Sequence, residues 1–503
     1  MQVEYGYLGI LLMENAGRRA AARILHHYPH QKYFIVIAGA GNNGGDGLVI
    51  ARYLYRHKKE LFLLISRSPE NLSALSRIQY DMIQRLGIPV HILSPDSLRL
   101  LSTFVERAPE KPLVIDALVG LGLERALREK EATLIEFLKE LRLPAVAVDL
   151  PSGLSGDTGQ VLSEPLSCSY TFTFQVPKIC HVVMPAARYC GKVEVLDIGI
   201  YPEVLDRIGA TSFLIGREGV RRLLPKRMSE AHKGTFGHVW VIGGSEGKAG
   251  AAALATIAAL RSGAGLATAL IPGSCAPAFH RKVLSGMSLP YGDVNVKYLN
   301  EITALWAAQH VEGKKALVVG PGLGANADTY GFLKAFLTEV RHLPAVLDAD
   351  ALNLIAAYKD LVEVLPHTAI LTPHPGEAAR LLGTTTERVQ AYRLESALHL
   401  AQKYQAVVIL KGAYPIIAAP RGETYFLPVA EPALATAGTG DVLAGMIGGF
   451  LAQGLTPVPA CIVSLYLYYR AARLAKQKLS APALTAATLL KFIGPSYKSL
   501  SKE

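Results

Sequence analysis

The chain has 503 residues, half of them hydrophobic, with 46 glycines and a formal net charge of +11. This length exceeds what one hydrophobic core usually serves, so we expect two or three domains, with α/β layers joined by glycine-rich turns. No run of about 18 apolar residues lacks a charge or a breaker, and the first residues show no basic segment followed by a cleavage site. The sequence therefore predicts neither a transmembrane helix nor a signal peptide.

The cysteines are few and form no Cys-x-x-Cys pair. An odd, sparse set favours a reducing compartment without structural zinc, and we expect a cytoplasmic protein. Lysine and arginine are scattered along the chain, so the net charge fits a basic face around anionic substrates, or ordinary solubility, as well as it fits RNA binding. We expect neither a nucleic acid nor a membrane as a partner. The five cysteines are Cys168, Cys180, Cys190, Cys275 and Cys461.

The first part of the chain alternates predicted strands with amphipathic helices, such as the helix expected over Leu72–Leu86. This alternation predicts a Rossmann-like, doubly wound parallel sheet. The alternation is lost between Tyr201 and Lys226, so we place the boundary near residue 212, between domains 1–212 and 213–503. The predicted strands are Tyr33–Ala38, Leu61–Ile65, Val90–Leu93, Leu113–Ala117, Ala145–Asp149 and Tyr170–Phe174.

A second alternating series follows the boundary, and three helices beginning at Val442, Val458 and Ala483 are expected to close the chain. The two halves share no motif in phase, so the sequence predicts two different α/β folds rather than an internal repeat. The strands predicted in the second series are His238–Ile242, Leu266–Ile271, Ala316–Val319, Ala345–Leu347, Ala369–Leu371 and Val407–Leu410.

A glycine-rich segment, Asn42–Gly47, directly follows the first predicted strand. Such a segment predicts a tight turn that leads into a helix, where backbone N–H groups and the positive end of the helix face an anion. The glycines would let the backbone approach a phosphate, and Asp46 would cap the helix. A plain strand-to-helix turn is the alternative, because glycine clusters are common in such turns.

Two aspartates end neighbouring predicted strands of the same half. Asp116 leads into Gly120-Leu121-Gly122, and Asp149 leads into Pro151-Ser152-Gly153. Ligands of open α/β sheets bind at the carboxyl ends of strands, so we expect both aspartates and the glycine-rich segment to meet in one crevice. Each aspartate could instead cap its own turn.

Four strings of this half, LLMENAGRRAA, AGAGNNGGDGLVIARYL, IDALVGLGL and VAVDLPSGLSGDTG, together resemble the NAD(P)H-hydrate epimerase domain of the bifunctional nicotinamide-nucleotide repair enzymes. The resemblance implies that Asp149 contacts the reacting nicotinamide hydrate. It implies a potassium ion on Asn43, Asp116 and Ser152, whose oxygens suit an alkali cation. It also implies substrate phosphates on two loops, formed by Asn42, Asn43, Gly44, Gly45 and Asp46 and by Gly120, Leu121, Gly122 and Leu123 of the segment 120–126.

The chain departs from that family pattern in two places. The family usually has a further helix before the LMENAG string, whereas this sequence begins almost at it. We therefore expect either a misassigned start or a shortened first domain that lacks part of the substrate lid and of a dimer contact. Leu121 stands where a threonine is usual, which removes a possible phosphate hydroxyl.

In the second half, Asp441 directly follows Gly438-Thr439-Gly440 at a predicted helix start. A carboxylate beside N–H groups that hold an anion is where phosphoryl transfer needs a general base for a substrate hydroxyl. A purely structural helix cap is the alternative. Further candidates follow other predicted strands: the loop Gly320–Gly324, His374 between two prolines, Lys411, whose ammonium could meet a nucleotide phosphate, and Asp348 and Asp350, which could orient a cation or ribose or only form a turn.

The strings VVGPGLG, LDADALN, LTPHPGEAARLLG, VILKG and AGTGDVLAG resemble the NAD(P)H-hydrate dehydratase branch of the ribokinase-like family, in the order of that family and over about residues 225–495. The resemblance implies that the hydrated dinucleotide contacts Ala251, Gly322, His374 and Asp441. It implies that ADP contacts Lys411, Gly412, Ala413, Tyr414, Pro415, Gly438, Thr439 and Gly440. Ala437 replaces a usual glycine, Glu431 replaces a usual asparagine and Tyr414-Pro415 is atypical, so we expect a nucleotide pocket altered in detail.

The resemblance implies repair of hydrated NADH and NADPH. The first domain would interconvert the R and S hydrates, and the second would dehydrate the S form with ADP, or ATP in some relatives, yielding AMP and phosphate. A magnesium ion would bridge the nucleotide phosphates, and relatives of both halves suggest a homo-oligomer. One alternative is a ribokinase-like vitamin-precursor kinase with a fused binding domain. Another is a first half that serves as an RNA-associated scaffold, although Asn43, Asp116, Asp149 and Ser152 argue for catalysis.

Overall fold

A computed structural model describes residues 5–501 of the chain. The chain divides into two compact units, Met1–Ala210 and Thr211–Glu503. Each unit contains its own sheet, and both units are α/β folds, as the sequence predicts. None of the helices within residues 5–501 is both long enough and apolar enough to span a bilayer.

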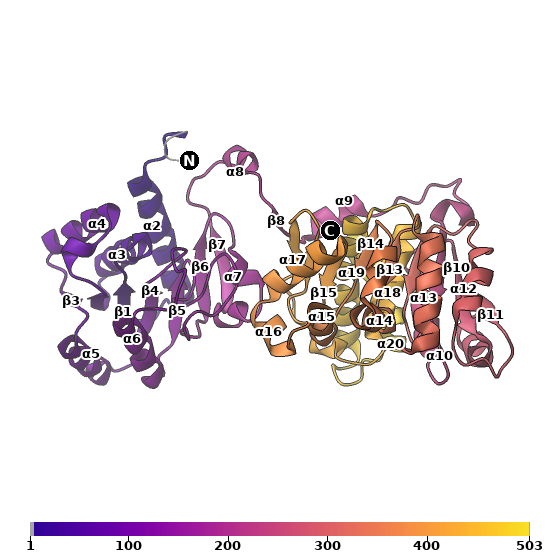
Figure 1. Ribbon diagram of the computed structural model, residues 1–503. Helices are drawn as coiled ribbons and strands as arrows, with labels where there is room; N and C mark the ends of the chain where they lie inside the picture. Colours follow the sequence, from indigo (N-terminus) through magenta and orange to yellow (C-terminus); the bar gives the residue numbers. More distant parts are fainter. Residues whose placement is uncertain (1–4, 502–503) are drawn as a thin grey trace. The chain divides into compact units, whose positions relative to one another are not determined.

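The first unit is built on one parallel sheet with the strand order β3-β2-β1-β4-β5-β6-β7 (Figure 1). The order 3-2-1-4-5-6 is that of a Rossmann sheet, so the predicted doubly wound fold is confirmed. The sequence analysis missed only β7, an edge strand whose residues are mostly not buried and which lacks an apolar run. The strands are β1 (Tyr33–Ala38), β2 (Glu60–Ile65), β3 (Val90–Ile92), β4 (Leu113–Ala117), β5 (Ala145–Val148), β6 (Tyr170–Phe174) and β7 (Lys192–Leu196).

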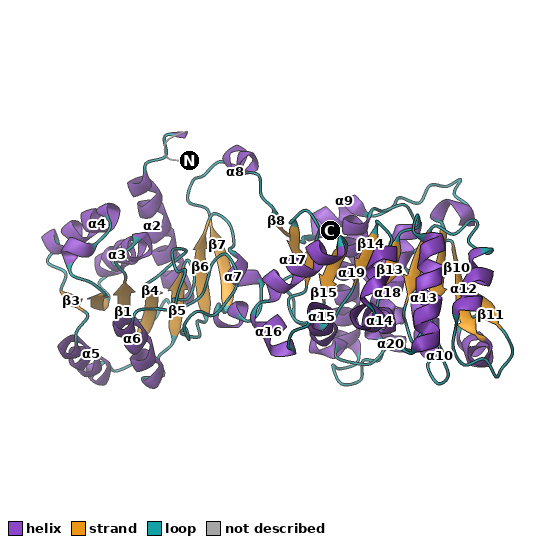
Figure 2. Cartoon of the chain, viewed as in Figure 1, coloured by secondary structure: helices purple, strands orange, loops and turns teal. Residues whose placement is uncertain are grey.

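Helices cover both faces of this sheet (Figure 2). Successive strand residues point to opposite faces, so Val36 packs into a core with α2 and α3, while Ile35 packs into a second core with α5 and α6. Burial on both faces explains why the central strands are continuous apolar runs. The helices are α2 (Gly9–His27), α3 (Asn42–Arg56), α4 (Ala74–Arg85), α5 (Pro95–Arg107), α6 (Glu129–Glu140), α7 (Ile179–Val182) and α8 (Pro202–Ile208).

The second unit is built on a sheet of ten strands with the order β11-β10-β9-β12-β13-β14-β15-β16-β17-β8. Neighbouring strands in this sheet are parallel, except that β16 runs antiparallel to β15 and to β17. The predicted strands of this half are all present. The edge strands β8 and β11 and the interior three-residue strands β16 and β17 were not predicted from the sequence. The strands are β8 (Ser212–Leu214), β9 (His238–Ile242), β10 (Leu266–Pro272), β11 (Met287–Tyr291), β12 (Ala316–Val319), β13 (Ala345–Leu347), β14 (Ala369–Leu371), β15 (Val407–Leu410), β16 (Ile416–Ala418) and β17 (Thr424–Phe426).

One face of the second sheet packs on α10 (Ala249–Arg261), α18 (Thr439–Ala452), α19 (Pro457–Lys478) and α20 (Ala486–Ser501). Gly445 allows α18 to lie directly on α10, because a Cβ there would come within 2.2 Å of the Ala255 carbonyl oxygen. On the other face, Trp240 of β9 meets Phe336 of α13 edge to face. The remaining helices are α9 (Arg217–Leu223), α11 (Ala276–Lys282), α12 (Glu301–Ala308), α13 (Ala327–Val340), α14 (Asp350–Ala357), α15 (Pro375–Leu382), α16 (Thr386–Ala391) and α17 (Arg393–Tyr404).

Candidate active sites

The glycine-rich segment of the first unit is the first turn of α3 rather than a turn before it. The helix begins at Asn42 with Gly41 as its N-cap, so the prediction that Asp46 caps the helix is wrong. Gly44 is buried, and a Cβ there would lie 1.8 Å from the Gly39 carbonyl oxygen. These glycines therefore let α3 pack onto the end of β1, and the close approach of a phosphate to this segment stays a prediction.

A cavity of about 830 Å³ lies at the carboxyl ends of the strands in this unit. It brings together residues that follow β1, β4 and β5, which are far apart in sequence. Gly44 and Gly45 are buried and do not line it. Of the predicted site residues, the lining contains Asn42, Asn43, Asp46, Gly120, Leu121, Gly122, Leu123 and Asp149.

Asp116 and Ser152 form a buried cluster beside this cavity. The Ser152 hydroxyl donates to one Asp116 carboxylate oxygen at 2.6 Å, and the Ser152 N–H donates to the other at 2.8 Å. The Val119 N–H donates to the Ser152 hydroxyl oxygen, and the next residue, Gly120, packs against Asn43. Both polar atoms of the Asn43 side chain are buried without a hydrogen-bond partner in the described structure. A buried amide lacking partners, next to a buried carboxylate, fits a site for a cation.

Asp149 follows β5 in a left-handed backbone conformation with φ of +65°, which is costly for a residue other than glycine. One of its carboxylate oxygens accepts hydrogen bonds from Lys178 Nζ at 2.6 Å and from the Thr173 hydroxyl at 2.9 Å. His181 Nε2 lies 3.0 Å from the Asp149 carbonyl oxygen. Burial, with the charge of Asp149 second, raises the pKa of Asp46 well above its ordinary value. The strained backbone and the lysine hold one carboxylate in a fixed orientation.

The sequence analysis missed two groups of residues in this unit. Lys178 comes four residues after the end of β6, and the residues that follow β6 were not considered as site residues. Its position just after a strand could have identified it. The cavity is also lined by the arginines Arg67, Arg125 and Arg128, which follow β2 and β4. These arginines are the cationic side chains expected around an anionic ligand.

In the second unit, Asp441 lies in the first turn of α18, whose N-cap is Gly438 with φ of +84°. Burial raises the pKa of Asp441 to about 7, the charge of Asp348 adds to this effect, and Lys411 opposes it. A carboxylate with a pKa near neutrality at the N-terminus of a helix is suited to accept a proton at physiological pH.

Lys411, at the end of β15, is held by two buried acids. Its ammonium lies 2.8 Å from an Asp348 carboxylate oxygen and 3.9 Å from one of Glu377. Burial opposes its charge, but these two carboxylates together keep the pKa of Lys411 above its ordinary value. A Cβ added to Gly440 would lie 3.4 Å from the Lys411 ammonium, so the lysine and the first turn of α18 face each other.

A cavity of about 420 Å³ adjoins this network. Glu431, the expected departure from the family pattern, lines it and pairs with Lys476 at 3.2 Å. Arg393, which the sequence analysis missed, donates to the Lys411 carbonyl oxygen at 3.1 Å and stabilises the loop that follows β15. Tyr414 and Gly438 do not line the cavity. The predicted residues that line it are His374, Lys411, Gly412, Ala413, Pro415, Thr439 and Gly440.

Ala251 and Gly322 lie against each other. A Cβ on Gly322 would be 3.0 Å from the Ala251 Cβ, and its φ of +65° requires glycine. Asp350 accepts a hydrogen bond from the Gly324 N–H at 2.8 Å, and its charge also raises the pKa of Asp441. Asp350 thus has a structural role in the loop beside the reactive carboxylate.

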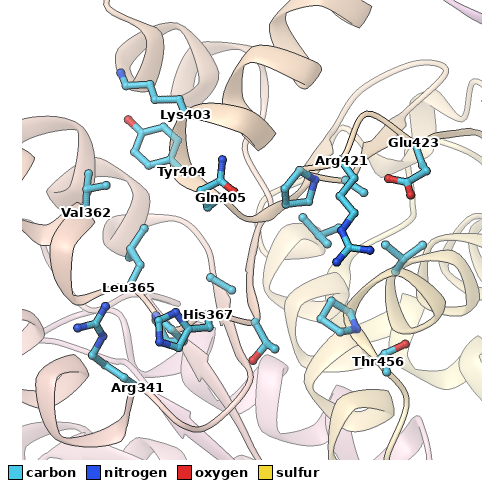
Figure 3. A pocket seen from close by; sticks show the side chains of 18 of the residues that line it. Arg341, Val362, Leu365, His367, Lys403, Tyr404, Gln405, Arg421, Glu423 and Thr456 are labelled. Atoms are coloured by element: carbon cyan, nitrogen blue, oxygen red, sulfur yellow. The ribbon is translucent and has the colours of Figure 1, made fainter. Parts of the chain in front are cut away.

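Figure 3 shows a third cavity, of about 1000 Å³, in the second unit. Ala369 and Val407, the first residues of β14 and β15, line it, so it lies at the amino ends of these strands. None of the predicted site residues lines it. Within residues 5–501, no three His, Cys, Asp or Glu side chains gather where they could hold a metal ion.

Comparison with known proteins assigns the chain to a family. A family profile for NAD(P)H-hydrate dehydratase matches residues 239–495, and one for the YjeF-related protein N-terminus matches residues 10–180. The bifunctional NAD(P)H-hydrate repair enzymes of Moorella thermoacetica and Salinibacter ruber are each 36% identical to it, covering 99% and 92% of this chain and 94% and 87% of their own lengths. A ribokinase-like superfamily protein from Enterococcus faecalis matches with a TM-score of 0.50 at 24% identity, over 58% of this chain and 97% of its own.

The fold and the two sites define a two-unit α/β protein, Rossmann-like and ribokinase-like, with a cavity lined by predicted site residues in each unit. The chain belongs to the family of bifunctional NAD(P)H-hydrate repair enzymes. Family membership supports this assignment and not the alternative of a vitamin-precursor kinase.

Proposed function

We propose that the chain repairs hydrated NADH and NADPH, the first unit exchanging the R and S hydrates and the second dehydrating the S form with ADP. The observation that carries the proposal is Asp441, a half-buried carboxylate with a pKa of about 7 at the N-terminus of α18. Family membership supplies the substrate class, and the two sites at separate sheet edges supply two reaction centres.

In the second unit, hydroxide is a poor leaving group, so the substrate hydroxyl must first be phosphorylated. Asp441 removes the proton from the C6 hydroxyl, and the oxygen attacks the terminal phosphoryl group of ADP, releasing AMP. N–H groups at the start of α18 stabilise the charge on the transferred group. Phosphate then leaves C6 as the ring nitrogen donates its electron pair, and loss of a C5 proton restores the dihydronicotinamide.

The nucleotide is assigned to the cavity lined by Lys411, Gly412, Ala413, Pro415 and Thr439. Its apolar walls, which include Leu434, Leu465 and Tyr468, suit a planar base, and the buried Lys411 suits the phosphates. A magnesium ion bound with the nucleotide would neutralise phosphate charge. ATP in place of ADP would use the same residues.

In the first unit, Asp149 is assigned to the reacting ring. The Lys178 ammonium supplies, through the Asp149 carboxylate to which it is hydrogen-bonded, the proton for the departing C6 hydroxyl, and the pair takes a proton back from the water that adds from either face, which exchanges R and S. Lys178 fixes this carboxylate and moderates its charge. Asn43, Asp116 and Ser152 are assigned to a potassium ion, because the Asn43 amide lacks partners and Asp116 is a buried acid. That ion would offset the charge of nearby substrate phosphates.

The proposal also places the protein in the cytoplasm as a homo-oligomer that acts on small molecules rather than nucleic acid. All five cysteines are buried and free, which agrees with a reducing compartment.

Supplying mixed R and S hydrate with ADP, and following the absorbance of the reduced nicotinamide, tests the whole proposal. Complete recovery is expected, and omission of ADP serves as the control. Recovery that stops at the S fraction would remove the epimerase assignment. No recovery at all would remove the dehydratase assignment.

A further inference from the structure

The spacing of the strands in the first sheet gives the length over which the cavity could hold a dinucleotide. The cavity is lined by residues that follow β5, β4, β1 and β2, which are consecutive in the sheet. Neighbouring strands lie about 4.8 Å apart, so the span from Asp149, after β5, to Arg67, after β2, crosses about 14 Å. If Asp149 faces the nicotinamide hydrate and the loops after β4 and β1 face the diphosphate, the adenosine end lies at β2.

The first unit has a further cavity, of about 380 Å³, next to the 830 Å³ cavity at this end. The two cavities share Arg67, Arg128 and Glu131. Ser66 also lines the second cavity, and its hydroxyl oxygen is buried without a hydrogen-bond partner in the described part of the chain. The end of β2 therefore combines two guanidinium groups with an unsatisfied buried hydroxyl.

Arg67 forms only a long ion pair within the protein. Its guanidinium lies 3.7 Å from a Glu131 oxygen, and a third of the Arg67 side chain is exposed. Within residues 5–501, Arg128 pairs with no carboxylate. An ion pair of that length at a half-buried site contributes little to stability, so most hydrogen-bond donors of both arginines are available to a ligand.

We propose that Ser66, Arg67 and Arg128 form a subsite for the 2′-phosphate of the adenosine ribose, so that the first unit prefers hydrated NADPH to hydrated NADH. This inference rests on the proposed function of the unit. Guanidinium groups bind phosphate oxygens through paired, charge-assisted hydrogen bonds, and the Ser66 hydroxyl supplies a further donor. The hydrated NADH substrate presents only a 2′-hydroxyl there, which leaves Arg128 without an anion and Arg67 with only the distant carboxylate of Glu131.

Exchange kinetics test the subsite in the full chain. The ratio of kcat/KM for R-to-S exchange of hydrated NADPH to that of hydrated NADH is measured for the wild type, Arg67→Gln and Arg67→Lys. We expect a wild-type ratio of at least about tenfold, lost in Arg67→Gln and partly kept in Arg67→Lys, from the strength of a charged hydrogen bond. Arg99→Gln, on an exposed face of α5, is the matched control. An equal ratio in wild type and Arg67→Gln overturns the subsite.

Binding separates failure of the subsite from failure of the proposed reaction. The full chain, saturated with ADP to occupy the second unit, is titrated with adenosine 2′,5′-bisphosphate and with 5′-AMP by calorimetry. The subsite predicts that the 2′-phosphate tightens binding about tenfold and that Arg67→Gln removes this gain. Equal affinity of the two nucleotides overturns the subsite whether or not the chain exchanges either hydrate. A gain without exchange would keep the subsite and reject the epimerase reaction.

Discussion

The two units each place one aspartate at the carboxyl edge of a parallel sheet, but they treat its charge in opposite ways. Asp149 accepts a hydrogen bond from Lys178 at 2.6 Å and another from Thr173. Asp441 forms no ion pair with any residue of the described chain, and burial with the nearby charge of Asp348 raises its pKa to about 7. The charge of Asp149 is balanced by Lys178, whereas the charge of Asp441 is disfavoured by burial and by the nearby carboxylate of Asp348.

This difference corresponds to two kinds of chemistry. A carboxylate held by a lysine in a strained backbone is oriented, and it suits a reaction in which a hydroxyl departs and returns on either face of a ring. A carboxylate with a pKa near neutrality accepts a proton readily, and it suits the activation of a hydroxyl for attack on phosphorus. Placement at a strand end is common to both sites, and the immediate electrostatic partner distinguishes them.

The largest expected effect comes from Asp441→Asn, which keeps the shape of the side chain but removes the base. Dehydration of pure S hydrate should fall by about 10²–10⁴-fold, while R-to-S exchange and ADP affinity remain. Turnover is followed by the absorbance of the reduced nicotinamide. Asp328→Asn, in the first turn of α13, is the matched control. Near-normal dehydration by Asp441→Asn would reject the phosphoryl-transfer mechanism.

The next largest effect is expected in the first unit, at the lysine that pairs with Asp149. Lys178→Gln removes the cation from Asp149, so R-to-S exchange should slow by about tenfold to a hundredfold, the strength of a charged hydrogen bond. Dehydration of pure S hydrate should be unaffected. Exchange is measured by chromatography of the two hydrates, with Lys192→Gln on the exposed edge strand as the control. Unaltered exchange in Lys178→Gln would show that the ion pair has no part in the reaction.

The pH dependence should differ between the two reactions. Burial raises the pKa of Asp441 to about 7, so the carboxylate is protonated, and inactive as a base, below that pH. The kcat/KM for dehydration should therefore be maximal above pH 7 and fall about tenfold per unit as pH decreases below it. A dehydration rate that stays constant from pH 8 to pH 5 would contradict the assignment of Asp441 as the base.

A smaller effect is expected at the proposed cation site. Replacing potassium by tetramethylammonium, or Asn43 by Ala, should weaken substrate binding to the first unit about twofold to tenfold, because one favourable contact with the phosphates is lost. Dehydration of pure S hydrate should not change. KM values for exchange in the two salts provide the measurement. Identical KM values in both salts would leave the unpaired amide of Asn43 without a cation.

Strand-end positions were predictable because parallel sheets bring distant carboxyl ends together, and this placed Asp149, Asn43 and Gly120 at one cavity before the structure was known. Central strands were predicted well since burial on both faces requires continuous apolar runs. The edge strands β7, β8 and β11 were missed because exposure leaves their sequences without such runs. The interior strands β16 and β17 are largely buried and were missed because each has only three residues.

Other features depend on partners that the sequence does not reveal. The hydrogen bond of Lys178 to Asp149 and the support of the Lys411 loop by Arg393 join segments whose contacts arise only after folding. The packing role of Gly44 was not predicted, because the sequence indicates a close approach but does not indicate that the Gly39 backbone is the neighbour.

Complementation between two chains that each lack one of the two reactions tests the central claim, that the two aspartates serve independent reactions, most directly. Mixed R and S hydrate is supplied with ADP to Asp149→Asn, to Asp441→Asn and to an equimolar mixture of both. We predict that Asp149→Asn recovers only the S fraction, that Asp441→Asn recovers almost nothing, and that the mixture recovers both fractions completely, because the hydrate diffuses from one chain to the other. A mixture that recovers no more than Asp149→Asn alone would contradict the independence of the two sites.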